Sequence, residues 1–219
     1  MAGFALAIGF SPPHIVVLLL LLLGPDPLRR AGWFVLAWWI TSALELGLML
    51  GVGHGLLLTM EKGSDHRTGL DLLAAGALLA VGLRELLGSA DQGEPPGWSR
   101  RLDAICALPL LPLLGLSSLI QVASPDDLFL YAKASGNLLA AGLGRGQEWV
   151  LGFLFTFSTA LLLLLPLLAL LLLGRERVLP GLRRGKDWLL NRADLLVAAV
   201  SLALAFYFGW QGIEGLRLG

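Results

Sequence analysis

Long apolar stretches constrain the fold of this chain more than any other feature of its sequence. A helix that crosses the hydrocarbon core of a bilayer needs about 20 mostly apolar residues, and a backbone in lipid must satisfy its own hydrogen bonds, which makes such spans helical. Six segments fit this description: residues 3–23, 32–58, 70–87, about 104–130, 149–173 and 195–216. The sequence therefore predicts an all-α polytopic membrane protein, folded as one integral membrane domain over residues 1–219.

Composition supports this class and excludes others. Charged residues make up only 15% of the chain, whereas a soluble domain carries roughly 25%. Lys plus Arg equals Asp plus Glu, at 16 each, so the basic surface expected of a nucleic-acid-binding protein is missing. The single cysteine, Cys106, excludes an internal disulfide or a dithiol relay. No Lys or Arg precedes Arg29, so we expect the first apolar segment to be a retained span, not a cleaved signal peptide.

The cations between the spans predict an orientation. The first, third and fifth loops contain ten Lys and Arg residues, namely Arg29, Arg30, Arg100, Arg101, Arg175, Arg177, Arg183, Arg184, Lys186 and Arg192. The remaining loops and the termini contain five. Because cytoplasmic loops carry an excess of Lys and Arg, this bias predicts odd-numbered loops in the cytoplasm and both termini outside it.

Two Ser-Pro pairs indicate an internal repeat. Ser11-Pro12 and Ser124-Pro125 lie 113 residues apart, and in each half a loop and a tryptophan-led span follow. With three spans each, repeat 1 (about residues 1–88) and repeat 2 (about 104–219), joined by loop 89–103, would have opposite orientations. That is the inverted-repeat plan of many secondary transporters. The alternative is a chance likeness between leucine-rich segments.

The prolines predict a site between the two halves. Proline removes a backbone N–H group and crowds the preceding turn, so we expect the first helix of each half to break there. A broken helix leaves carbonyl and N–H groups without partners, and these are tolerated at membrane depth only inside protein or around a watery cavity. Two matching breaks therefore indicate one central site.

At these residues the sequence resembles the lysine-exporter (LysE) superfamily, and within it the GAP family of sulfolipid- or peptidoglycolipid-addressing proteins. The resemblance implies about six spans in two inverted halves, each with a proline motif in its first helix. In the second half of these proteins the motif commonly reads Asn-Pro-Lys, often followed by Asn. The matching residues here are Ser124, Pro125, Asp126 and Asp127, preceded by Gly115.

This chain departs from that motif in the sign of its charge. Asp126 stands where the family has lysine, and Asp127 stands where it often has asparagine. An anionic lipid headgroup therefore cannot be carried over to this site. The resemblance implies export or translocation of a small or lipid-like solute across the bacterial plasma (inner) membrane, coupled to a proton or another cation.

Buried acids are the main candidates for the chemistry. A carboxylate at mid-membrane costs at least about 2.5 kcal/mol, so it is usually partnered or functional. Either Asp126 and Asp127 serve this role, or the fourth span ends near Ala123 and the two cap an interfacial helix in water. Glu45 lies about 20 Å into the second span and has no evident partner in its own half, because Arg84 lies at a different depth.

The predicted substrate- or ion-coupling residues lie at the two breaks and in the second span: Asp126, Asp127, Glu45, Ser124, Pro125, Ser11, Pro12 and His14. Lys133 either pairs loosely with a carboxylate or extends to the interface. Hydroxyl groups in the paired spans either line the path or bond their own backbone; they belong to Thr41, Ser42, Ser158 and Thr159. Gly47, Gly51 and Gly55 recur every fourth residue and predict a close helix contact.

No pattern indicates an enzyme, a metal site or a cofactor. The three histidines form no helix-face pair, and no phosphate-binding loop, nucleophile elbow or zinc-protease motif occurs. The leading prediction is a secondary exporter or translocation factor. The alternative is a non-transporting membrane partner that assists a lipid synthesis or export complex. The expected partners are membrane lipids, the solute and the coupling ion, and no nucleic acid is expected. The sequence leaves open whether the protein forms a homo-oligomer.

Overall fold

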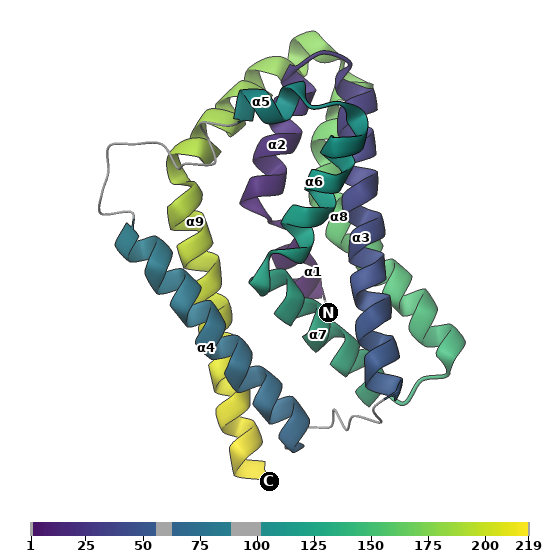
Figure 1. Ribbon diagram of the computed structural model, residues 1–219, viewed down its shortest axis with the longest axis vertical. Coiled ribbons are helices and arrows are strands. Elements are labelled where there is room, and N and C mark those ends of the chain that lie inside the picture. Colours follow the sequence, from purple (N-terminus) through teal and green to yellow (C-terminus); the bar gives the residue numbers. More distant parts are fainter. Residues whose placement is uncertain (1, 56–62, 89–101, 219) are drawn as a thin grey trace.

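The computed structural model describes residues 2–55, 63–88 and 102–218, and within these residues the chain is entirely helical, without strands. Nine helices follow one another along the described chain (Figure 1): α1 Ala2–Gly9, α2 Pro12–Leu23, α3 Pro27–Gly55, α4 Asp65–Gly88, α5 Leu102–Ala107, α6 Leu110–Val122, α7 Pro125–Ala140, α8 Arg145–Leu173 and α9 Arg175–Leu218.

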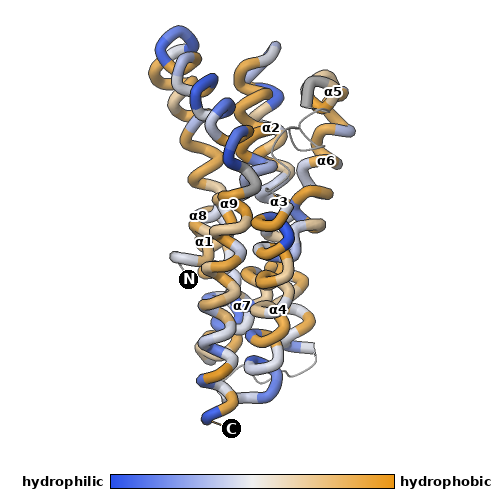
Figure 2. Tube along the Cα trace, turned by 90° about the vertical axis from the view of Figure 1, so that its left-hand side faces the viewer, coloured by the Kyte–Doolittle hydropathy of each residue, from blue (hydrophilic) through white to orange (hydrophobic). Residues whose placement is uncertain are grey.

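Most of the helices run along the long axis of an elongated bundle. Hydrophobic residues dominate its middle, and hydrophilic residues concentrate toward both ends (Figure 2). By length and composition, three segments of the described chain can cross a membrane: α3, α8 and residues Leu195–Leu218 of α9. The pair α1–α2 forms a fourth span if it is counted as one helix bent by 54°. The fold is thus that of an integral membrane protein.

The third and fourth predicted spans do not meet the same criteria. Helix α4 covers the third span but carries Asp71, Arg84 and Glu85. The predicted fourth span is divided among α5, α6 and the start of α7, because Pro109 precedes α6 and Pro125 begins α7. The described residues therefore support three to four spans on length and apolarity, not six.

Both Ser-Pro pairs interrupt the helices, where the sequence predicts the breaks. Ser11 has backbone angles of φ −90° and ψ 104°, and Ser124 has φ −82° and ψ 105°. In each case the serine is the N-cap and a proline begins the next helix. Proline disfavours the helical conformation in the residue before it but suits the first helical position. The same dipeptide therefore ends one helix and begins another in both places.

The predicted fifth loop is instead the first part of α9, and this part of the prediction is wrong. Gly174, with φ 80°, separates α8 from α9, and the helix then continues from Arg175 through Pro180 into the last span. Leu182 and Leu189 are buried, and Gly185 lies against Leu19 of α2. This spacing of three to four residues marks one face of a helix.

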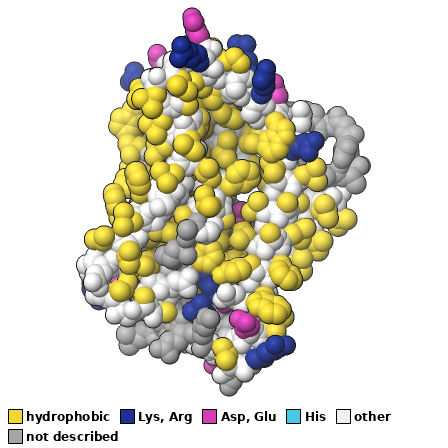
Figure 3. All heavy atoms as spheres, turned by 180° about the vertical axis from the view of Figure 1, so that it is seen from behind, with side chains coloured by type: hydrophobic (Ala, Val, Ile, Leu, Met, Phe, Trp, Pro, Cys, Tyr) yellow, Lys and Arg dark blue, Asp and Glu magenta, His cyan; other side chains and the backbone are white. Residues whose placement is uncertain are grey.

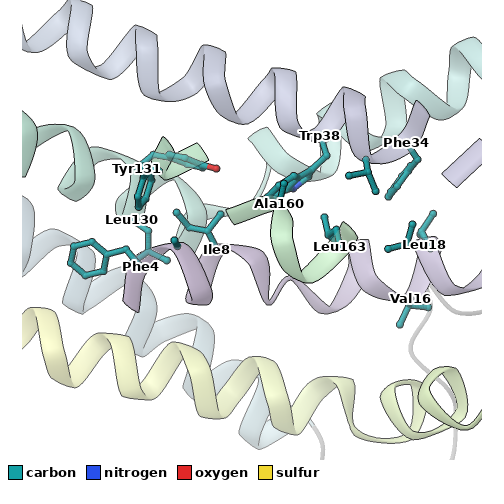
Figure 4. Packing of buried hydrophobic residues seen from close by; sticks show 14 of the residues in the cluster. Phe4, Ile8, Val16, Leu18, Phe34, Trp38, Leu130, Tyr131, Ala160 and Leu163 are labelled. Atoms are coloured by element: carbon teal, nitrogen blue, oxygen red, sulfur yellow. The ribbon is translucent and has the colours of Figure 1, made fainter. Parts of the chain in front are cut away.

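Buried side chains from several helices form the core. Figure 4 shows Phe4 and Ile8 of α1 near Leu130 and Tyr131 of α7, and Trp38 of α3 near Leu163 of α8. Helix α4 lies beside α9, where glycines permit close contact: a Cβ atom on Gly212 would lie 2.6 Å from the Leu72 side chain. Seen from behind, hydrophobic side chains cover the middle of the molecule, and Lys and Arg lie along the upper end (Figure 3).

Candidate site at the helix breaks

His14 connects the first break to the second half of the chain. Its side chain is fully buried, with Nδ1 2.8 Å from the Ser11 hydroxyl and Nε2 3.1 Å from the backbone oxygen of Ser117 on α6. A carbonyl oxygen only accepts, so Nε2 carries the hydrogen and donates it, while Nδ1 of the neutral ring accepts from Ser11. The Ser117 hydroxyl in turn donates to the Phe34 carbonyl on α3 at 3.0 Å.

Glu45 also has a partner across the two halves. The amide Nε2 of Gln121, near the end of α6, donates to Glu45 Oε2 at 3.1 Å. One turn from Glu45, the hydroxyl groups of Thr41 and Ser118 are hydrogen-bonded at 2.8 Å. The expectation that Glu45 finds no partner in its own half is compatible with this contact, because Gln121 belongs to the other half. Polar groups of α3 therefore face α6 just before the second break.

The two aspartates lie at the start of α7, directly after the second break. Asp127 is only 2% exposed and Asp126 is half-buried. Asp127 lies close enough to Asp126 and Glu45 for the three carboxyl groups to interact electrostatically. Ser124 donates locally to the Ile120 carbonyl at 3.2 Å. The surrounding helices thus enclose Asp127.

Neutral polar groups extend this acidic cluster toward α8. Ser42 and Thr159 lie beside the hydroxyl group of Tyr131, which is one turn beyond Asp127 on α7. Several buried oxygen atoms here have no hydrogen-bond partner among the described residues: Ser42 Oγ, Glu45 Oε1, Gln121 Oε1, Asp127 Oδ2 and the Tyr131 hydroxyl. Buried polar atoms are normally hydrogen-bonded, so these oxygens have hydrogen-bonding capacity that the described residues leave unused.

The other predicted hydroxyl groups are occupied by their own helices. Ser158 donates to the Leu154 carbonyl at 2.7 Å, and Thr159 donates to the Thr156 carbonyl at 2.7 Å. Thr41 donates to the Ala37 carbonyl and accepts from the Ser118 hydroxyl. Among the described residues no group of three or more His, Cys, Asp or Glu side chains is arranged to hold a metal ion.

Sequence patterns missed two buried acids that pair with basic side chains. Lys133 neither pairs loosely nor extends to the interface: it is buried on α7 and contacts both carboxylate oxygens of Asp71 on α4. Glu148 at the start of α8 is bonded to His54 of α3 at 2.8 Å. Both acids lie near helix ends in the sequence, where carboxylates are common and indicate no particular partner. Only the tertiary structure therefore reveals these pairs.

These features define the class: a helical integral membrane protein with two proline-broken segments and with buried carboxyl groups beside the second break. Comparison with protein families identifies the group within this class. The family described as "Sap, sulfolipid-1-addressing protein" matches residues 1–214, and the chain belongs to that family. No curated protein and no solved structure gave a match.

Proposed function

We propose that this protein is a secondary exporter, or translocation factor, for a small or lipid-like solute, and that a proton or another cation drives it. The observation that carries the proposal is the Asp127 carboxyl group, which is buried beside a helix break with Oδ2 unpartnered. A carboxyl group in this position binds a proton or a cation more readily than it remains charged and alone.

The acids are assigned to the coupling ion and not to an anionic part of the solute. Asp127 interacts electrostatically with Asp126 and with Glu45, and like charges at short range favour uptake of a cation or a proton. The N-terminus of α7 offsets only part of the cost, because a helix terminus stabilises an anion by about 0.3–1 kcal/mol. Gln121, Ser42 and Tyr131 add neutral oxygen atoms that suit a dehydrated cation.

The arrangement of the helices supports two inverted halves. Helices α1–α2 with α3 and α4 would form one half, and α6–α7 with α8 and α9 the other. The chain runs upward through α1–α2 and downward through α6–α7 (Figure 1), and both broken segments begin their second helix with the same Ser-Pro pair. In transporters of this plan, the ion and the solute bind at the breaks. On the basis of this plan we also propose a relation to the lysine-exporter superfamily.

The family description refers to addressing of a sulfolipid, and we extend it to this chain as a lipid-like solute. We propose that the arginine-rich end, where Arg30 donates to the Leu108 carbonyl and Arg175 to the Leu23 carbonyl, lies in the cytoplasm, because cytoplasmic loops carry an excess of Lys and Arg. Both termini then lie on the outer side of a bacterial plasma membrane. We propose transport without enzymatic conversion of the solute.

The experiment is a flux assay in proteoliposomes under an imposed proton or sodium gradient. The readouts are the internal pH and the transfer of a short-chain fluorescent lipid between leaflets. The double variant D126N/D127N is expected to insert and fold but to lose gradient-driven flux. The matched control D187N changes an exposed aspartate on α9 and is expected to retain it. Undiminished flux in D126N/D127N would refute the assignment of these acids.

The alternative role, a non-transporting partner, gives a different result in the same preparation. It predicts that the purified protein supports no flux under either gradient and that a second protein co-purifies with it at a fixed ratio. That combined outcome would replace the exporter proposal with an assembly role.

A further inference from the structure

A second polar feature lies away from the helix breaks, in a cleft between the second half of α3 and the start of α8. The cleft has a volume of about 300 Å³. Its lining combines glycines of α3 with charged and aromatic side chains of α8: Gly47, Leu50, Gly51, His54, Gly55, Arg145, Glu148 and Trp149. The turn that leads into α8 lies at the lower right of Figure 1.

The glycines of α3 form the floor of this cleft instead of a helix contact. A Cβ atom added to Gly51 or Gly55 would meet nothing within 4 Å, and one on Gly47 would reach only the ring of Trp149, at 3.6 Å. The expected close packing of another helix on this stripe is therefore wrong within the described chain. The close contact of α3 instead occurs at Gly53, which lies against Leu139 of α7.

The inner wall presents a buried acid with one free oxygen. Glu148 is only 5% exposed, and His54 Nε2 bonds its Oε2 at 2.8 Å. Its other oxygen, Oε1, has no hydrogen bond among the described residues and is not sealed inside the protein. A carboxylate held in this way accepts hydrogen bonds from a donor that enters the cleft.

A cation lies one helical turn from this acid. Arg145 is three residues before Glu148, so both side chains lie on one face of α8, and both line the cleft. Arg145 is exposed, and it begins α8 after the N-cap Gly144. The N–H groups at a helix start attract anions. The cleft thus offers a donor for an oxyanion and an acceptor for a cation on one face of α8.

We propose that this cleft binds one phospholipid whose headgroup carries both a phosphodiester and a primary ammonium group, as phosphoethanolamine does. The phosphate would contact Arg145 and the start of α8, and the ammonium would donate to Glu148 Oε1. An acyl chain would follow the groove above Gly51 and Gly47, with Trp149 at headgroup depth, where tryptophan is enriched.

Charge complementarity favours the phosphoethanolamine headgroup over other phospholipid headgroups. A phosphoglycerol headgroup would meet Arg145 through its phosphate but would offer Glu148 only neutral hydroxyl groups, whose hydrogen bonds to a carboxylate are weaker than those of an ammonium group. A quaternary ammonium group, as in phosphocholine, has no hydrogen to donate to Glu148. The inference does not depend on transport at the helix breaks, because no residue of the cleft belongs to the acidic cluster of Glu45, Asp126 and Asp127.

The test is lipid competition on the purified, detergent-solubilised protein, with retained lipid measured by native mass spectrometry. The probes are dioleoyl lipids with phosphoethanolamine, phosphocholine and phosphoglycerol headgroups. The wild type is expected to retain the phosphoethanolamine lipid about tenfold better than either competitor, because a charge-assisted hydrogen bond provides at least that much discrimination. E148Q is expected to lose the preference for the phosphoethanolamine lipid over the phosphocholine lipid. R145Q is expected to weaken retention of both of these lipids.

Three further variants make the outcome decisive. G51L fills the open floor and is expected to abolish retention of all three lipids, whereas E214Q, at an exposed acid of α9, should behave as the wild type. D126N/D127N should bind the lipid normally, which separates this site from the transport site. Equal or stronger binding of phosphoglycerol, or an E148Q variant with unchanged preference, would overturn the proposal. So would a wild-type dimer that G51L converts to a monomer, because a second copy would then occupy the groove.

Discussion

The ammonium group of Lys133 on α7 contacts both carboxylate oxygens of Asp71 on α4, and each residue is only 2% exposed. The Lys133 nitrogen also lies 5.9 Å from the centre of the Phe208 ring of α9. Helix α4 packs mainly along α9, so this ion pair is a polar attachment between that helix pair and the rest of the bundle.

Breaking the pair from one side should destabilise the protein strongly. K133M leaves Asp71 buried and charged without its lysine, and we expect a loss of about 3–5 kcal/mol in the free energy of unfolding. The double variant K133M/D71L should lose much less, because no buried charge remains. Denaturant unfolding in detergent micelles measures both. K186M, in a pair whose Asp187 is largely exposed, should change stability by less than about 1 kcal/mol. If the double variant lost as much as the two single changes together, the pair would not be coupled.

Glycine at the end of α1 should be required for the first break. A Cβ atom on Gly9 would press against the backbone oxygen of Thr159 on α8, and a backbone atom cannot move aside as a side chain can. We expect G9A to cost about 1–3 kcal/mol through overpacking. G3A, in the same helix with nothing within 4 Å, should stay within about 0.5 kcal/mol of the wild type. Thermal unfolding of the two variants side by side measures the difference, and equal midpoints would contradict the close approach.

His14 should act as a structural tie between the two halves. H14A removes the contacts to Ser11 and to the Ser117 carbonyl and leaves space beside Phe34 and Trp38, whose rings lie 5.8 and 6.0 Å away. We expect a loss of about 1–3 kcal/mol from the buried polar group left without its partner, plus the cost of the cavity. H66A, at an exposed histidine, is the control. If H14A had the stability of the wild type, the hydrogen bonds of His14 would contribute nothing to the free energy of unfolding.

Glu45 should be dispensable for folding and needed for coupling. Its Oε1 is buried without a partner, so an amide of the same shape removes a charge that the protein otherwise has to bury. We expect E45Q to unfold at the same or a higher denaturant concentration than the wild type, while gradient-driven flux falls. A loss of more than about 1 kcal/mol in E45Q would instead assign this acid a structural role.

The breaks could be predicted from the sequence because they depend on local chemistry. A proline restricts its own φ angle and the residue before it, whatever surrounds them, and so Ser11 and Ser124 interrupt the helices as expected. The sequence predicts that Glu45 and Asp127 belong to one central site, but it does not predict their contacts. That Gln121 donates to Glu45 depends on how α6 lies against α3.

The ion pair of Asp71 and the helical start of α9 were found only from the tertiary structure. Asp71 lies in a stretch with charged residues near the start of α4, and nothing in its neighbourhood indicates that Lys133, 62 residues away, is its partner. The arginines and Pro180 at the start of α9 favour a loop in the sequence, whereas Leu182 and Leu189 form the buried face of a helix in the structure. That face could have been recognised from its helical spacing alone.

Helix α9 joins the arginine-rich end of the bundle to the opposite end, from Arg175 to Leu218, and it changes direction between its first part and the last span (Figure 1). Near its start it touches α2 through Gly185 and Leu19, and farther along it fits closely against α4 at Gly82 and Gly212. A tilt imposed where the arginines meet lipid headgroups would therefore act first on α2 and would reach α4 only through the bend.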